Sequence, residues 1–150
     1  MGRYLIVTHL IEGDDQLAAT CSRLSSADPE AEFVLVVPAV ALALELLIEP
    51  RRSPSRFAAQ RAQRARARLL EANVNVTATR LGNFDPVQAV EDALRFSQYS
   101  AVVVAAPQHP MLRVIHRDLP RLLGRRFPGL TVVDAADQDH RIVASDQPVS

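Results

Sequence analysis

Five short apolar runs, separated by stretches with a helical pattern, constrain the fold of this chain more than any other feature. Runs of this length between polar or turn-forming residues are typical of buried strands, and apolar residues at helical spacing between them indicate helices. Strands that alternate with helices form parallel sheets joined by right-handed crossovers. The strands are predicted at Tyr4–Thr8, Phe33–Val37, Val74–Thr79, Ala101–Ala105 and Leu130–Val133.

The predicted fold is therefore an α/β, Rossmann-like, doubly wound sheet of five parallel strands in the order 3-2-1-4-5, with helices on both faces. Ser53 or Ser55 starts one helix, and Asp85 with Pro86 provides the N-cap and first residue of another. A short helix is predicted from Leu119 to Arg126. Residues 1–134 are expected to form a single domain, and residues 135–150 a flexible C-terminal tail with few large apolar side chains.

The charged residues are balanced in number but unevenly placed. Lysine is absent, and the segment Arg51–Arg68 holds seven arginines and no acid. We interpret this segment as a solvated helix face, with Arg61, Arg64 and Arg68 directed towards water. Contact with an acidic surface of a second copy is the alternative. Nucleic acid is not expected as a partner, because Phe57 is the one aromatic residue among these arginines.

Other patterns argue against a membrane protein and against an enzyme. The longest apolar stretch, Val34–Ile48, is interrupted by Pro38 and Glu45 and is too short to span a bilayer, so no membrane partner is expected. The single cysteine, Cys21, lies on the apolar face of a predicted helix and fits the reducing cytoplasm, which is the expected location. No Gly-x-Ser-x-Gly elbow is present and no paired carboxylates share a convincing face, so no catalytic residues are assigned.

Three stretches of the sequence narrow the choice of family. Leu81–Val90 resembles the segment of universal stress proteins in which a glycine, an Asp or Asn and a proline open the helix after the third strand. Tyr99–Val104 is similar to the approach to the fourth strand of that family, and Arg125–Val133 to its last helix and strand. The resemblance covers residues 3–134. It implies a universal-stress-protein-like domain and the doubly wound fold already predicted.

The ATP signature of that family is missing. Nucleotide-binding members carry a glycine, a second glycine three residues on, and a glycine with serine or threonine after nine further residues. Ala105, Gln108 and Asp118 with Leu119 stand at those positions here, and no glycine lies between Gly82 and Gly124. Thr8 or His9 replaces the aspartate at the end of the first strand. The chain therefore resembles the branch without the nucleotide motif, no cofactor is expected, and ATP and AMP are disfavoured.

The crevice at the carboxyl ends of the first and fourth strands is still the default binding position in such a sheet. Two ligands are considered for this crevice, a small anion or a metal held by His9, His109 and His116. The alternative is that these residues belong to loops that bind no ligand. No metal is expected, because the spacing of the three histidines matches no known metal motif. The candidate crevice residues are Thr8, His9, Gln108, His109, Arg113, His116 and Arg117.

Three hypotheses for function follow. The first is a non-enzymatic domain that acts through homodimerisation and contacts with an unidentified protein. The resemblance implies a dimer through the last strand, Leu130–Val133, whose apolar edge would be exposed if no second copy paired with it. The second is a sensor that binds a nucleotide or another anion through Arg113, His116 and Arg117. A weak nucleotide hydrolase is the third, and the absence of a nucleophile or metal motif argues against it.

Overall fold

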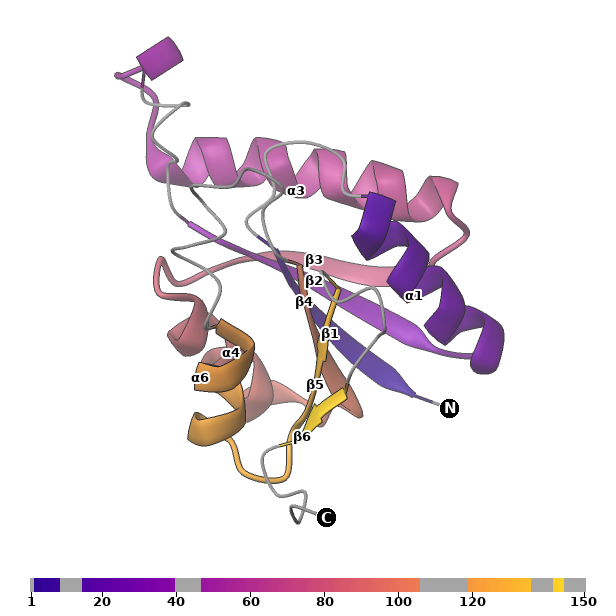
Figure 1. The fold of residues 1–150 in the computed structure, drawn as a ribbon. Helices are drawn as coiled ribbons and strands as arrows, with labels where there is room; N and C mark the ends of the chain where they lie inside the picture. Colours follow the sequence, from indigo (N-terminus) through magenta and orange to yellow (C-terminus); the bar gives the residue numbers. More distant parts are fainter. Residues whose placement is uncertain (1, 9–14, 40–46, 106–118, 136–141, 145–150) are drawn as a thin grey trace.

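The computed structural model describes residues 2–8, 15–39, 47–105, 119–135 and 142–144. These residues form one mixed sheet with helices on both sides (Figure 1). The strand order is β3-β2-β1-β4-β5-β6, and the first five strands run parallel, as predicted. The strands are β1 (Arg3–Thr8), β2 (Glu32–Pro38), β3 (Val76–Gly82), β4 (Ala101–Ala105), β5 (Thr131–Asp134) and β6 (Ile142–Ala144), and the helices are α1 (Asp15–Ala27), α3 (Pro54–Glu71), α4 (Pro86–Phe96) and α6 (Leu119–Arg126).

The sixth strand was not predicted. β6 lies within the segment expected to be a flexible tail and pairs antiparallel with β5, with Val132 opposite Val143. The prediction that Leu130–Val133 is a sheet edge open to a second copy is therefore wrong, because β6 pairs with that side of β5. Residues 136–141 and 145–150 lie outside the described residues, so the rest of the tail prediction and the boundary at 134 stay predictions.

Each face of the sheet has its own apolar core. Ile6, Leu35 and Val103 point to the face covered by α1 and α3, and their strand neighbours point to the face covered by α4 and α6. Tyr4 stacks on Phe33 on the first face, with ring centroids 5.2 Å apart. Cys21 is fully buried there, which confirms its interpretation as a core residue. Continuous apolar strands are expected in a sheet that is covered on both faces.

Local signals account for the helix ends. Ser53 caps α3 by accepting the N–H of Arg56, and Asp85 caps α4 by accepting the N–H of Val87 at 3.0 Å. Proline occupies the first turn of both helices, where a missing N–H costs little. Both caps and the bounds of α6 were predicted from the sequence.

The C-terminal end of α3 is closed by a left-handed residue. Asn73 has a φ of 62°, and its N–H donates to the carbonyl of Leu70 at 3.1 Å. The N–H of Val74 reaches back to the carbonyl of Leu69 at 3.0 Å. These two bonds form a Schellman motif, and the buried side chains of Leu69 and Val74 supply its usual apolar contact.

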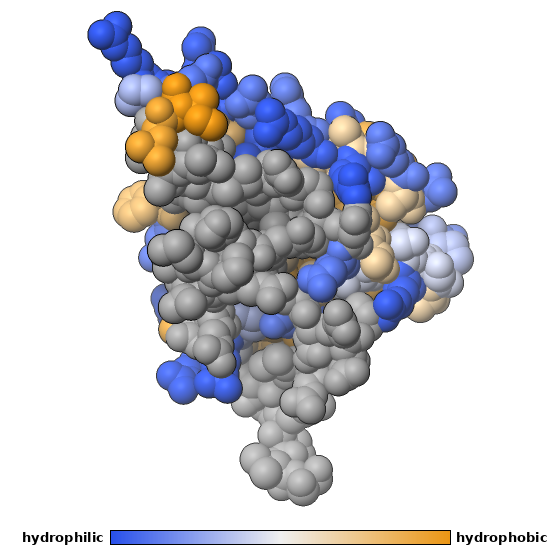
Figure 2. Space-filling model, turned by 45° about the horizontal axis from the view of Figure 1, so that its top comes forward, coloured by the Kyte–Doolittle hydropathy of each residue, from blue (hydrophilic) through white to orange (hydrophobic). Residues whose placement is uncertain are grey.

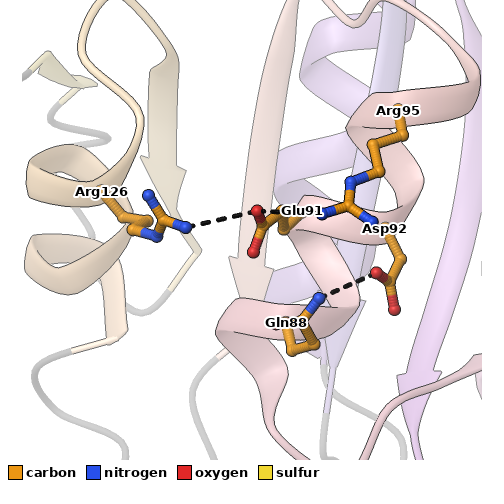
Figure 3. A network of polar contacts seen from close by, with 5 residues as sticks. All are labelled: Gln88, Glu91, Asp92, Arg95 and Arg126. Atoms are coloured by element: carbon orange, nitrogen blue, oxygen red, sulfur yellow. Dashed lines mark hydrogen bonds and ion pairs between the residues drawn. The ribbon is translucent and has the colours of Figure 1, made fainter.

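Helix α4 is held against the sheet and against α6. A Cβ atom on Gly82 would lie 2.7 Å from Cβ of Ala89 and 2.8 Å from Cγ1 of Val36, so glycine allows α4 to approach β3 closely. On the outer side, Oε1 of Glu91 accepts from Arg126 of α6 at 3.2 Å and from Arg95 at 3.4 Å (Figure 3). Among the described residues, no helix combines the length and apolar character needed to cross a bilayer.

Candidate functional site

The carboxyl ends of β1 and β4 meet at the centre of the sheet. Thr8, the last residue of β1, pairs in register with Ala105, the last residue of β4. The chain turns to opposite faces from these two strands, because α1 packs on one core and α6 on the other. Such a change of direction leaves a crevice between the two strand ends, where doubly wound sheets bind ligands.

Thr8 is the one predicted crevice residue that falls among the described residues. Its side chain is 1 % exposed, so it is enclosed at the carboxyl end of β1. The other candidates, His9, Gln108, His109, Arg113, His116 and Arg117, lie outside the described residues. Their assignment to the crevice therefore stays a prediction, and so does the grouping of three histidines. Within the described part of the chain, no cluster of three His, Cys, Asp or Glu side chains could hold a metal ion.

Arg61 is placed differently from the prediction. It was expected to face water, but its side chain is 2 % exposed and it is among the largest fully buried side chains of the described residues. Its Nη2 donates to the carbonyl oxygen of Pro38 at 3.3 Å. Pro38 ends β2, and β2 runs parallel to β1, so the guanidinium lies at the same end of the sheet as Thr8.

A signal for this burial was present in the sequence. Arg61 follows Phe57 by four residues and precedes Ala65 by four, so it lies on the side of α3 that carries the apolar stripe. Its charge led to the expectation of exposure, although the helical spacing favoured the core. Arg64 is exposed as predicted, and Arg68 is half-buried.

A carboxyl group with a displaced pKa lies at the other end of the sheet. The backbone N–H of Gly2 donates to the carboxylate of Asp28 and lowers its pKa below the ordinary value of 3.8. Gly2 precedes β1, so this contact joins the amino end of that strand to the end of α1. Asp28 fixes the N-terminal segment and takes no part in the crevice.

The architecture is similar to that of a known protein family. The crystal structure of a protein from the universal stress protein family of Burkholderia pseudomallei matches with a TM-score of 0.52 and 21% sequence identity, over 86% of this chain and 93% of that one. The chain thus has the fold of a universal stress protein.

A mutant of T5 5′-exonuclease aligns with a TM-score of 0.40 and 12% identity, over 96% of this chain and 54% of that one. No protein-family model matches the sequence, and no curated protein matches it.

Proposed function

We propose that this chain is a non-enzymatic binding domain with the universal stress protein fold. It acts in the cytoplasm through contacts with a second copy and with another protein, and not through ATP. The observation that carries the proposal is the lack of glycine from the end of β4 at Ala105 to Gly124, within α6. A phosphate cradle needs backbone N–H groups that come close to the anion, and glycine permits that approach.

Two further residues argue against a phosphate at the start of α6. Asp118 directly precedes the first residue of this helix in the sequence, and a carboxylate there can accept the free N–H groups and repel an anion. Pro120, in the first turn, has no N–H to donate and is buried. The site that would hold nucleotide in this fold thus offers fewer donors and an opposing charge.

Thermal unfolding of the full chain with and without Mg-ATP, ADP and AMP tests this proposal. We expect no change in the unfolding temperature. A ligand at about 100 times its dissociation constant stabilises the folded state by about 2.7 kcal/mol, which is a clear shift for a domain of this size. A shift of that kind would contradict the proposal.

We propose that two copies associate through β6, the outer strand on that side of the described sheet. An edge strand offers unpaired backbone N–H and C=O groups to a second copy. Light scattering is expected to give twice the 16.5 kDa mass of one chain. A single-chain mass at all concentrations would refute the dimer. If the dimer persists after deletion of residues 136–150, the two copies contact each other through another surface.

An anion sensor is the second candidate, and the position of Arg61 favours it. The guanidinium of Arg61 is buried at the carboxyl end of β2, which is the crevice end of the sheet. Arg113, His116 and Arg117 would then hold the anion in place of glycine amides. The test is a ligand-dependent gain in stability that is lost in Arg113→Ala or Arg117→Ala. ATP turnover that disappears in His109→Ala would instead support the hydrolase hypothesis.

A further inference from the structure

A basic surface runs along α3 and the turn before it. We define this α3 basic surface by Arg51, Arg56, Arg64 and Arg66, all of which are exposed. In the described part of the chain, none of these four side chains forms an ion pair. The helix has 18 residues, so at about 1.5 Å per residue it is roughly 27 Å long. Its positive charge is available to a partner of opposite charge along most of that length.

The acidic residue before α3 is already neutralised. Glu49 forms an ion pair with Arg52, with 2.7 Å between Oε2 and Nε. Arg52 is held in place on two other sides, because its Nη1 donates to Gln60 at 2.9 Å and its guanidinium lies 5.6 Å from the ring centre of Phe57. Arg52 therefore cancels the charge of Glu49 and leaves Arg51 and Arg56 to face an incoming anion.

An open hollow lies at this end of the surface. It has a volume of about 490 Å³ and is lined by Glu49, Pro50, Arg51, Arg52 and Arg56. Three arginines against one paired carboxylate give the hollow a net positive charge.

Two aliphatic side chains stand beside the hollow. Leu47 is 81 % exposed and Ile48 is 71 % exposed. Their short turn lies beyond the N-terminal end of α3, at the outermost corner of the described fold (Figure 1). In Figure 2, hydrophobic side chains adjoin a line of hydrophilic ones at the upper corner. A projecting aliphatic pair next to exposed arginines is an arrangement that suits the boundary between lipid headgroups and acyl chains.

We propose that this corner of the protein docks on an anionic lipid bilayer, with arginines on the headgroup phosphates and Leu47 and Ile48 in the acyl boundary. A nucleic acid would use the arginines but offers the aliphatic pair no apolar surface. The aromatic residue of α3, Phe57, is buried and unavailable for stacking on bases. This proposal departs from the expectation that the chain has no membrane partner, because docking on a bilayer surface requires no spanning segment.

Sedimentation of the full chain with vesicles tests the proposal. We expect binding to phosphatidylcholine vesicles that contain phosphatidylglycerol, little binding to phosphatidylcholine alone, and loss of binding at high salt. Each arginine near an anionic surface contributes about fivefold in partitioning, equivalent to about 1 kcal/mol. Arg51→Gln with Arg56→Gln, two exposed residues that line the hollow, should therefore weaken binding about 25-fold.

Arg121→Gln with Arg125→Gln is the matched control, because both residues are exposed on α6, across the sheet from α3. This pair should leave binding unchanged. Leu47→Ser with Ile48→Ser should weaken binding about tenfold or more by removing the apolar contact. Thermal unfolding of each variant verifies that it is folded.

Three results would overturn the proposal. The first is no binding to the anionic vesicles at low salt, and the second is an equal loss in the α6 control pair, which would mean general charge attraction. The third is a binding strength that does not depend on Leu47 and Ile48 and is matched by duplex DNA. That result would indicate that the surface binds the phosphate backbone of a nucleic acid.

Discussion

The guanidinium of Arg61 donates a hydrogen bond from Nη2 to the carbonyl oxygen of Pro38, 3.3 Å away, inside the core between α3 and the sheet. The contact links the middle of the longest helix to the last residue of β2. A charge in this position is costly to bury, so its hydrogen bonds matter more than those of a surface arginine.

Shortening Arg61 should therefore destabilise the fold. Arg61→Ala removes a large buried side chain together with its hydrogen bond to Pro38, and we expect a loss of about 3 kcal/mol in the free energy of unfolding. Arg61→Met, which keeps most of the volume, should lose about 1 kcal/mol. Urea denaturation measures both, with the exposed Arg64→Ala as a control within about 0.5 kcal/mol of the parent. Equal effects at positions 61 and 64 would contradict the buried position.

Asn73 should respond differently to two small substitutions. Its φ of 62° is accessible to glycine without strain but disfavoured for alanine. Asn73→Gly should leave stability unchanged or raise it by about 0.5 kcal/mol, whereas Asn73→Ala should lower it by about 1 kcal/mol. The control is Asn75→Ala, at an exposed position that does not have a positive φ. If the alanine variants at 73 and 75 unfold alike, the Schellman motif does not limit stability.

Asp28 should make stability depend on pH. Its carboxylate accepts the N–H of Gly2, and its pKa is lowered in the folded chain. A lowered folded pKa adds stability at pH above the unfolded value, and this stability is lost as pH falls through the folded pKa. The parent should thus exceed Asp28→Asn in stability at neutral pH, and the difference should shrink below pH 3.8. Chemical denaturation across this range checks it; a difference that does not vary with pH would refute the role.

Gly82 should tolerate no side chain. A Cβ atom there would lie 2.7 Å from Cβ of Ala89, so Gly82→Ala should destabilise the fold by about 2 kcal/mol through overpacking. Adding Ala89→Gly should recover part of the loss, so that the two changes are not additive. Gly129→Ala is the control, because a Cβ at Gly129 meets open space and its cost comes from the φ of 87° alone, so Ala89→Gly should not relieve it. Additive effects at 82 and 89 would mean that the two residues do not limit each other.

The elements with strong local signals were predictable from the sequence. Asp85 with Pro86 fixed the start of α4, and the apolar run at Ala101–Ala105 fixed β4 to the residue. The strand order also followed, because alternation of strands and helices leaves few arrangements open. These features depend on short-range chemistry that a single sequence contains.

Arg61 and β6 were not predicted, because tertiary context decides both. Residues Ile142–Ala144 make a run too short to stand out, and the partner strand lies about ten residues earlier in the chain. For Arg61, the helical spacing indicated a position in the core. Charged residues are usually exposed, so exposure was predicted instead. The candidate crevice was predicted as a position in the sheet, and Thr8 is the part of it that the structure places.

A ribosome synthesises β5 before β6, and this order affects how the newly made protein folds. β5 emerges before the strand that covers its outer side. During that interval the exposed backbone can pair with a neighbouring nascent chain on the same message. Rapid synthesis of the residues after Asp134 therefore shortens the period in which misassembly competes with folding.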